Sequence, residues 1–181
     1  MENQNTPSNT YKTTNNKLVT GMFRDRESTE HAYNTLHERG YNQDEVHLLM
    51  SDETRKKHFS DDTEIGTKAA EGLGKGSAIG GTVGAIAGAV AAIGTAIVIP
   101  GLGFAIAGPI AAALAGAGAG GLTGGIIGAL VGVGIPEERA RIYEDGIKNG
   151  NVIIGVTPRN EDDAEYFRSN WTANNGEEIH H

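Results

Sequence analysis

GLGKGSAIGGTVGAIAG, residues 72–88, divides this chain into two halves and carries a glycine at every fourth position. Glycine in a helix interior costs on the order of 1 kcal/mol relative to alanine, so a fixed spacing of glycines needs a reason. Small residues four positions apart lie on one face of a helix and let a facing helix approach closely. The stretch therefore predicts helix packing through five glycines: Gly72, Gly76, Gly80, Gly84 and Gly88.

The same spacing returns further along, inside a block without charge. From Gly76 to Pro136 the sequence contains no Asp, Glu, Lys, Arg or His. Pro100 and Gly101 break a helix in the middle of this block, and Pro109 suits the start of the next helix. We therefore predict a Gly/Ala-rich helical hairpin over residues 72–135 that turns at these three residues. The small residues of its second arm are Ala112, Gly116, Gly120, Gly124, Gly128 and Gly132.

Both arms of the predicted hairpin are long enough to cross a membrane. Residues 76–98 and 109–134 each exceed the roughly 20 residues needed for a hydrocarbon core of about 30 Å. Basic residues flank both ends of the block, as the positive-inside tendency favours. These are Lys68, Lys75, Arg139 and Arg141. We predict that the hairpin inserts in the inner (cytoplasmic) membrane, in contact with lipid, and that both termini lie in the cytoplasm.

The alternative is a cytoplasmic, self-assembling protein whose hairpin helices pack against each other in water. Gly and Ala are only weakly apolar, and Phe104 is the only aromatic residue in the block. In both cases the glycines drive homo-oligomer formation, and the larger apolar side chains point away from the packed face. In the second arm these side chains are Leu122, Ile126, Ile127, Leu130 and Val131.

The polar segment before the block predicts a strand, a helix and a second strand. KLVTGMF (17–23) is rich in residues that favour strands. The helix that follows has Asp25 or Ser28 as its N-cap and stops at Gly40. DEVHLLMS (44–51) alternates as a strand does, with Val46, Leu48 and Met50 on one side and Glu45, His47 and Leu49 on the other.

The segment after the block predicts the same order behind one connecting helix. That helix starts at Pro136 and ends at Gly150. A strand over 151–158, a helix over 160–171 and a short strand over 176–180 follow. Together the halves predict an α+β, ferredoxin-like domain, in which two βαβ units form a four-stranded antiparallel sheet with both helices on one face. The hairpin is then inserted between strands 2 and 3.

This interpretation divides the chain into five parts. Residues 1–16 are Asn/Thr-rich and predict a disordered tail without a secretory signal. Residues 17–60 are the first half of the ferredoxin-like domain, and residues 61–71 are a linker. Residues 72–135 are the hairpin, and residues 136–181 supply the connecting helix and the second half of the domain.

The sequence nominates no catalytic, cofactor-binding or metal-binding residue. The net charge of −8 argues against a nucleic-acid partner, and the absence of cysteine excludes thiolate metal sites. GAGAGG (116–121) fits a dinucleotide fingerprint, but no strand precedes it; GLGKGS has Gly76 where a phosphate loop needs Ser or Thr. The histidines lack metal-ligand spacing and are interpreted as surface residues: His31, His37, His47, His58, His180 and His181.

Two segments resemble known bacterial stress proteins. Residues 19–52 resemble the opening of the general stress protein 17M-like (YflT-type) domain. The block with its central IPGLG, together with GIPEERARIYEDGIKNGNVIIGV (134–156), is similar to DUF1269-like, low-temperature-induced stress proteins. The resemblance covers about residues 18–171 and implies a non-enzymatic protein made under stress. The hypothesis is a stress-response protein, attached to the membrane by the hairpin or, alternatively, a soluble scaffold or binder of an unidentified small ligand.

Overall fold

The computed structural model describes residues 17–59, 97–99, 103–111 and 125–181. Within these ranges the chain is an α+β protein with one antiparallel sheet, which confirms the α+β part of the predicted fold. The strands are β1 (Val19–Phe23), β2 (Val46–Ser51), β3 (Ile97–Ile99), β4 (Phe104–Ala107), β5 (Val152–Val156) and β6 (Glu177–His180). The helices are α1 (Arg26–Glu38), η1 (Gln43–Glu45, a 3₁₀ turn), α2 (Asp52–Phe59), α7 (Gly125–Gly132), α8 (Glu137–Lys148) and α9 (Glu161–Ala173).

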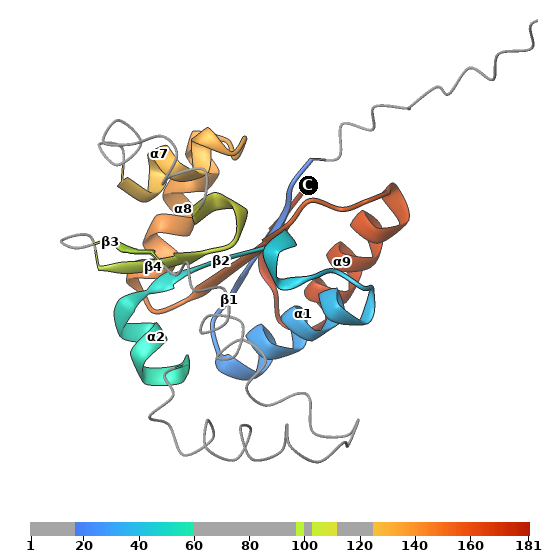
Figure 1. Cartoon of the computed structure of the whole chain (residues 1–181), viewed down its shortest axis with the longest axis horizontal. Coiled ribbons are helices and arrows are strands. Elements are labelled where there is room, and N and C mark those ends of the chain that lie inside the picture. Colours follow the sequence, from blue (N-terminus) through green and yellow to red (C-terminus); the bar gives the residue numbers. More distant parts are fainter. Residues whose placement is uncertain (1–16, 60–96, 100–102, 112–124) are drawn as a thin grey trace, which may run out of the picture.

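The described strands lie in the order β3-β4-β2-β5-β1-β6 (Figure 1). Strand β5 runs antiparallel between β1 and β2, with Val156 opposite both Val19 and Val46. The first half of the chain therefore leaves a space between its two strands, and a strand from the second half fills it. This interleaving makes the pairing of the halves obligatory, because neither half closes a sheet alone.

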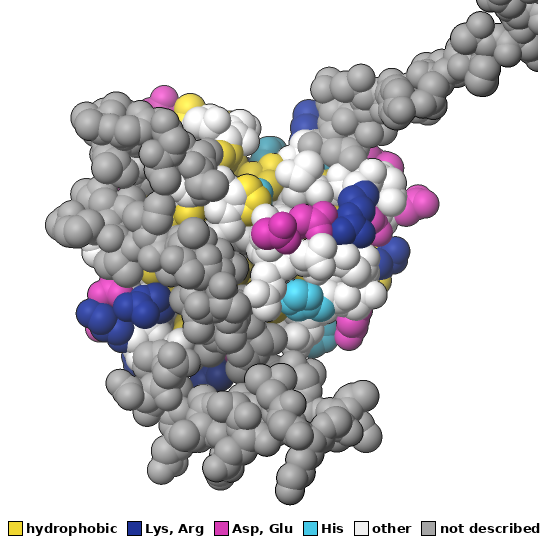
Figure 2. All heavy atoms as spheres, viewed as in Figure 1, with side chains coloured by type: hydrophobic (Ala, Val, Ile, Leu, Met, Phe, Trp, Pro, Cys, Tyr) yellow, Lys and Arg dark blue, Asp and Glu magenta, His cyan; other side chains and the backbone are white. Residues whose placement is uncertain are grey.

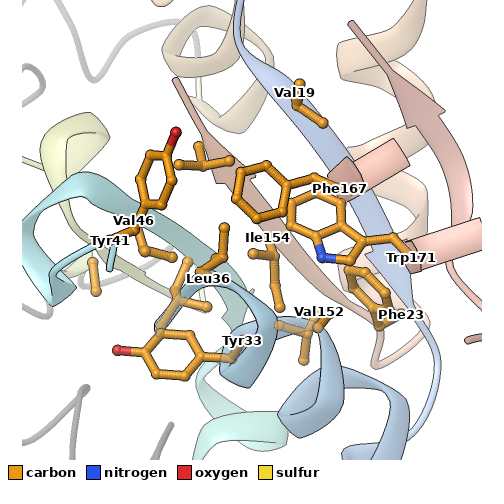
Figure 3. Packing of buried hydrophobic residues seen from close by; sticks show 14 of the residues in the cluster. Val19, Phe23, Tyr33, Leu36, Tyr41, Val46, Val152, Ile154, Phe167 and Trp171 are labelled. Atoms are coloured by element: carbon orange, nitrogen blue, oxygen red, sulfur yellow. The ribbon is translucent and has the colours of Figure 1, made fainter. Parts of the chain in front are cut away.

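Helices α1 and α9 cover one face of the sheet (Figure 1). Both N-termini are capped. Of the two candidates in the sequence, Asp25 caps α1, because its carboxylate accepts from the Ser28 N–H at 2.8 Å; in α9, the Asn160 side-chain oxygen accepts from the Asp163 N–H at 2.8 Å. Figure 3 shows Phe23, Phe167 and Trp171 gathered in the core beneath these helices. The ring centroids of Phe23 and Trp171 are 5.8 Å apart in an edge-on arrangement.

Helices α7 and α8 lie over the opposite face, so the described chain forms three layers. Strand residues alternate between the two faces, and Met22, Leu49 and Ile153 point towards α8. Tyr143 and Ile147 of α8 are completely buried against them. The side of the sheet left open by the predicted domain is therefore covered by residues around the end of the uncharged block.

The centre of the uncharged block forms strands, which corrects part of the predicted hairpin. Strands β3 and β4 pair antiparallel, with Ile99 opposite Phe104, and β4 pairs with β2. The β-branched run Ile97–Ile99 favours a strand, and β4 satisfies the backbone groups on the outer edge of β2. The predicted helix over 76–98 is therefore wrong at its end. Pro100 and Gly101 lie outside the described residues, and Pro109 begins a helical segment described through residue 111.

The predicted outward direction of the apolar side chains of the second arm is wrong for Ile126 and Leu130, whereas Val131 is exposed as predicted. Ile126 and Leu130 of α7 are buried in the core beneath α7 and α8, whereas Gly128 and Gly132 are exposed. No described atom lies within 4 Å of a Cβ built on either glycine. The larger side chains of α7 pack in one core with the apolar face of α8, so Gly128 and Gly132 lie on its opposite, exposed side. The other predicted packing glycines lie outside the described residues: Gly72, Gly76, Gly80, Gly84, Gly88, Gly116, Gly120 and Gly124.

Among the described helices, none combines the length and the apolar character that crossing a membrane requires. Helix α7, the described helix of the uncharged block, has 8 residues.

Candidate functional site

A cavity of about 440 Å³ opens at one end of the sheet, beneath the connection between α7 and α8. The C-terminal end of β6 lies beside the start of β1 at this end of the molecule (Figure 1). In Figure 2, hydrophobic and histidine side chains show in the hollow between the α7 side of the molecule and the entry into β1. The lining residues are Lys17, Leu18, His47, Val133, Gly134, Ile135, Pro136, Thr157, His180 and His181.

A row of residues crosses the sheet beside this cavity. His47 is opposite Gly155, Gly155 is opposite Thr20, and Thr20 is opposite His180. Residues paired directly across antiparallel strands point to the same face, which here is the face of α8. A Cβ at Gly155 would lie 3.2 Å from Thr20 Cγ2 and 3.4 Å from His47 Cβ. Gly155 therefore leaves room for the two larger side chains beside it.

His47 is held by the start of the helical segment at Pro109. The Ile110 N–H donates to His47 Nδ1 at 3.2 Å. The first N–H groups of a helix have no partner within the helix, so the imidazole acts as a cap. Gly108 makes this corner possible: its φ is +85°, and a Cβ there would overlap the carbonyl oxygen of Val46. His47 thus joins β2 to the covering segment.

This hydrogen bond fixes which ring nitrogen of His47 carries the proton. Because Nδ1 accepts, the neutral ring must carry its proton on Nε2, which is then a donor. His47 is 6% exposed, and burial lowers its pKa to about 4, so the ring is neutral at physiological pH. No described residue accepts a hydrogen bond from Nε2. The cavity is therefore lined by a side chain whose Nε2–H donor has no partner among the described residues.

A second polar chain fixes β6 to α8. The Tyr143 hydroxyl donates to the Glu178 carbonyl oxygen at 2.7 Å and, since its proton is used there, accepts from the Thr20 hydroxyl at 2.8 Å. Arg139 donates to the same carbonyl at 3.3 Å and to the Glu178 carboxylate at 3.1 Å. Burial raises the pKa of Tyr143, so the phenol stays protonated. These bonds fasten α8 to β6, the strand that contributes His180 to the lining of the cavity.

The lining of the cavity is rich in donors. Lys17 stands at the start of β1, and none of the described lining residues is acidic. Partial burial lowers the pKa of His180, and the positive charges of Arg139 and Lys17 lower it further. The cavity thus combines one lysine, neutral imidazole and apolar walls from Leu18, Val133 and Ile135. Such a lining suits a ligand that accepts hydrogen bonds and has an apolar part.

The described residues contain no cluster of three or more His, Cys, Asp or Glu side chains placed to hold a metal ion. His47 is also in the wrong tautomer to add a ligand atom from inside the cavity, because a metal-binding nitrogen must be unprotonated. We therefore assign the cavity no metal.

A second cavity, of about 340 Å³, lies at the opposite end of the strands and is mainly polar. It includes Arg24, Lys57 and Lys148. Arg24 is paired with Glu177 at 2.7 Å and Lys148 with Glu144 at 3.3 Å. Two of these three basic side chains therefore already have carboxylate partners. The cavity next to His47 is the better candidate for a ligand-binding site.

The sequence did not single out the residues of this cavity. The interpretation of His47 as a surface residue is wrong, because the alternation of β2 puts it on the face that α7 and the Pro109 segment cover. An unexplained histidine in an otherwise apolar strand was the available signal. The predicted packing glycines that are described, Gly128 and Gly132, do not line the cavity.

Comparison with known proteins adds no assignment. No family model, no curated protein and no solved structure matches the chain. The resemblance to general stress proteins therefore stays a prediction, and the function is argued from the site.

Proposed function

We propose that this chain is a non-enzymatic binding module that takes a small organic ligand in the cavity next to His47. The observation that carries the proposal is the Nε2–H of His47, a donor without a partner among the described residues on a side chain that lines the cavity. Ligand sites combine apolar walls with a few polar groups that fix the orientation of the ligand, so an unused donor in a cavity of this size suits a ligand that accepts a hydrogen bond.

The proposed architecture is a ferredoxin-like domain with an insertion that covers its open face. The order β2-β5-β1-β6 within the sheet supports this, because two βαβ units interleave in the way that the split βαβ pattern requires. In this arrangement residues 60–136 are the insertion, and its described parts supply β4, the Pro109 segment and α7. The insertion would then provide one wall of the binding site.

The test is a thermal-shift screen of the full chain against small organic acids, amides, amines and sugars. A ligand that binds only the folded chain raises its melting temperature. Thr157→Trp fills the cavity from its exposed rim and should abolish the shift. Thr172→Trp, on the exposed side of α9, is the matched control and should keep it. Shifts that survive Thr157→Trp, or the absence of any shift, would contradict the proposal.

We keep the membrane-attached oligomer as a second candidate, because the run from Gly76 to Pro136 contains no charged residue. In this case the glycine spacing would pack helices within or between subunits in a bilayer. Alkaline carbonate extraction of membranes from expressing cells separates the candidates. Retention in the pellet supports insertion, whereas release as a particle of defined size supports a self-assembling soluble protein.

A further inference from the structure

The cavity next to His47 has features that restrict the charge and shape of its ligand. Every titratable side chain in its described lining is a lysine or a histidine. A bound amine would face these groups with no acidic side chain in the described lining to pair with. A ligand that covered the Nε2–H of His47 without accepting a hydrogen bond from it would leave that donor unsatisfied in the complex, which weakens binding. The acceptor must therefore come from the ligand.

The fixed positive charge is small. Lys17 is the one lysine or arginine among the described lining residues, and the ring of His47 is neutral. Arg139 is not among the described lining residues, and its guanidinium is paired with the Glu178 carboxylate. One lysine balances one negative charge, and a dianion such as phosphate would carry a second charge into partly apolar surroundings without a partner.

The walls favour an apolar body. Leu18, just before β1, lines the same space as Val133 and Ile135 of the connection between α7 and α8, with Pro136 beside them. Ile135 is 3% exposed, so this side of the cavity is part of the core beneath α8 rather than loose surface. An inorganic anion would leave this apolar surface in contact with water.

We propose that the ligand is an organic monocarboxylate with a small apolar body, bound with its carboxylate towards His47 and Lys17 and its body against Leu18, Val133 and Ile135. The inference rests on the proposed binding function and adds the chemical class of the ligand. A carboxylate only accepts hydrogen bonds, and its two oxygens can satisfy both donors at once.

The experiment uses hexanoate and benzoate as probes, with hexanamide as the neutral isostere, hexylamine as the cation and inorganic phosphate as the dianion. Binding to the full chain is measured by calorimetry and by the imidazole NMR signals of His47. We expect both carboxylates to bind, to shift the His47 signals, and to bind at least tenfold more tightly than the other three probes.

Two substitutions at His47 separate its two roles. In His47→Asn the amide oxygen takes the place of Nδ1, so the cap on Ile110 remains and the Nε2 donor is lost. In His47→Gln the amide nitrogen takes the place of Nε2, so the donor remains and the cap is lost. We expect His47→Asn to weaken hexanoate about tenfold and His47→Gln to weaken it less than threefold while lowering the melting temperature.

Lys17→Ala tests the charge without disturbing the core, because Lys17 is exposed. It should weaken hexanoate about tenfold and leave hexanamide unchanged, and Lys57→Ala at the opposite end of the strands is the matched control. If hexanamide binds as tightly as hexanoate, or if phosphate or hexylamine binds more tightly, the inference that the ligand is a monocarboxylate is contradicted. The proposed binding function would still hold in that case. If no probe binds and the wider screen also finds no ligand, both the inference and the proposed function fail.

Discussion

The face of the sheet under α1 and α9 is filled by aromatic rings, whereas the face under α7 and α8 carries a row of polar side chains around Gly155. On the first face Phe167 and Trp171 stack with centroids 5.7 Å apart. On the second face His47 and Thr20 each form a hydrogen bond to the covering layer. The same strands build both faces, because successive side chains alternate between them.

The comparison separates the face of the sheet that stabilises the fold by apolar packing from the face that has the candidate binding cavity beside it. Apolar packing is non-directional and fills space, and on the α1 and α9 side it joins the rings of both helices to the strands. Polar groups require partners in defined directions, and their row on the other side lies beside the cavity that His47 lines. Substitutions on the two faces should therefore differ in kind as well as in size.

The largest effect is expected from Trp171→Ala on the aromatic face. Trp171 is fully buried, and removing its ring leaves a cavity among Phe23, Phe167 and Thr35, so we expect a loss of about 3–5 kcal/mol in the free energy of unfolding. Urea denaturation measures it. Val131→Ala, at a side chain 43% exposed on α7, is the control and should change stability by less than about 0.5 kcal/mol. Similar losses in both variants would contradict the contrast between the faces.

The next effect is a pH dependence caused by His47. Its pKa is about 4 when folded against an ordinary value of 6.5, so between these values the unfolded chain binds a proton that the folded chain does not. The free energy of unfolding should therefore be highest above pH 6.5 and fall by up to about 3 kcal/mol as the pH drops towards 4. Lys17, His180 and His181 line the same cavity and are present in both of the proteins compared next.

Urea denaturation at pH 7.5 and pH 5 of the wild type and of His47→Asn isolates this contribution. The variant keeps an acceptor for Ile110 and does not titrate, so its stability should fall less between the two pH values. An identical fall in both proteins would mean that His47 is not buried in its neutral form.

A smaller loss is expected from Tyr143→Phe. The substitution leaves the ring in place and removes the hydroxyl that links Thr20 to the Glu178 carbonyl. We expect a loss of about 1–2 kcal/mol, because the buried Thr20 hydroxyl then lacks its partner. Tyr166→Phe is the matched control, since its hydroxyl makes no hydrogen bond with the described residues. If the two variants are equally stable, the polar chain does not fasten β6 to α8.

The smallest effect is expected from Gly128→Ala, and whether this substitution raises or lowers stability shows whether the α7 glycines pack against another helix. A Cβ at Gly128 meets no described atom within 4 Å, so Gly128→Ala should gain the difference in helix propensity, about 0.5–1 kcal/mol. If Gly128 packs against another helix, as the glycine spacing predicts, the same substitution should instead reduce stability and shift the oligomer distribution. Thermal unfolding with size-exclusion chromatography distinguishes the outcomes.

The sequence by itself determined the order of strands and helices in the two polar segments and the start of the first helix near Asp25. These features depend on neighbours within a few residues, so periodicity and capping chemistry reveal them. The tertiary structure alone decided that Ile97–Ile99 and Phe104–Ala107 extend the sheet, and that Ile126 and Leu130 turn inwards. It also buried His47 and formed the cavity, because β2, the Pro109 segment and β6 meet there from distant parts of the chain.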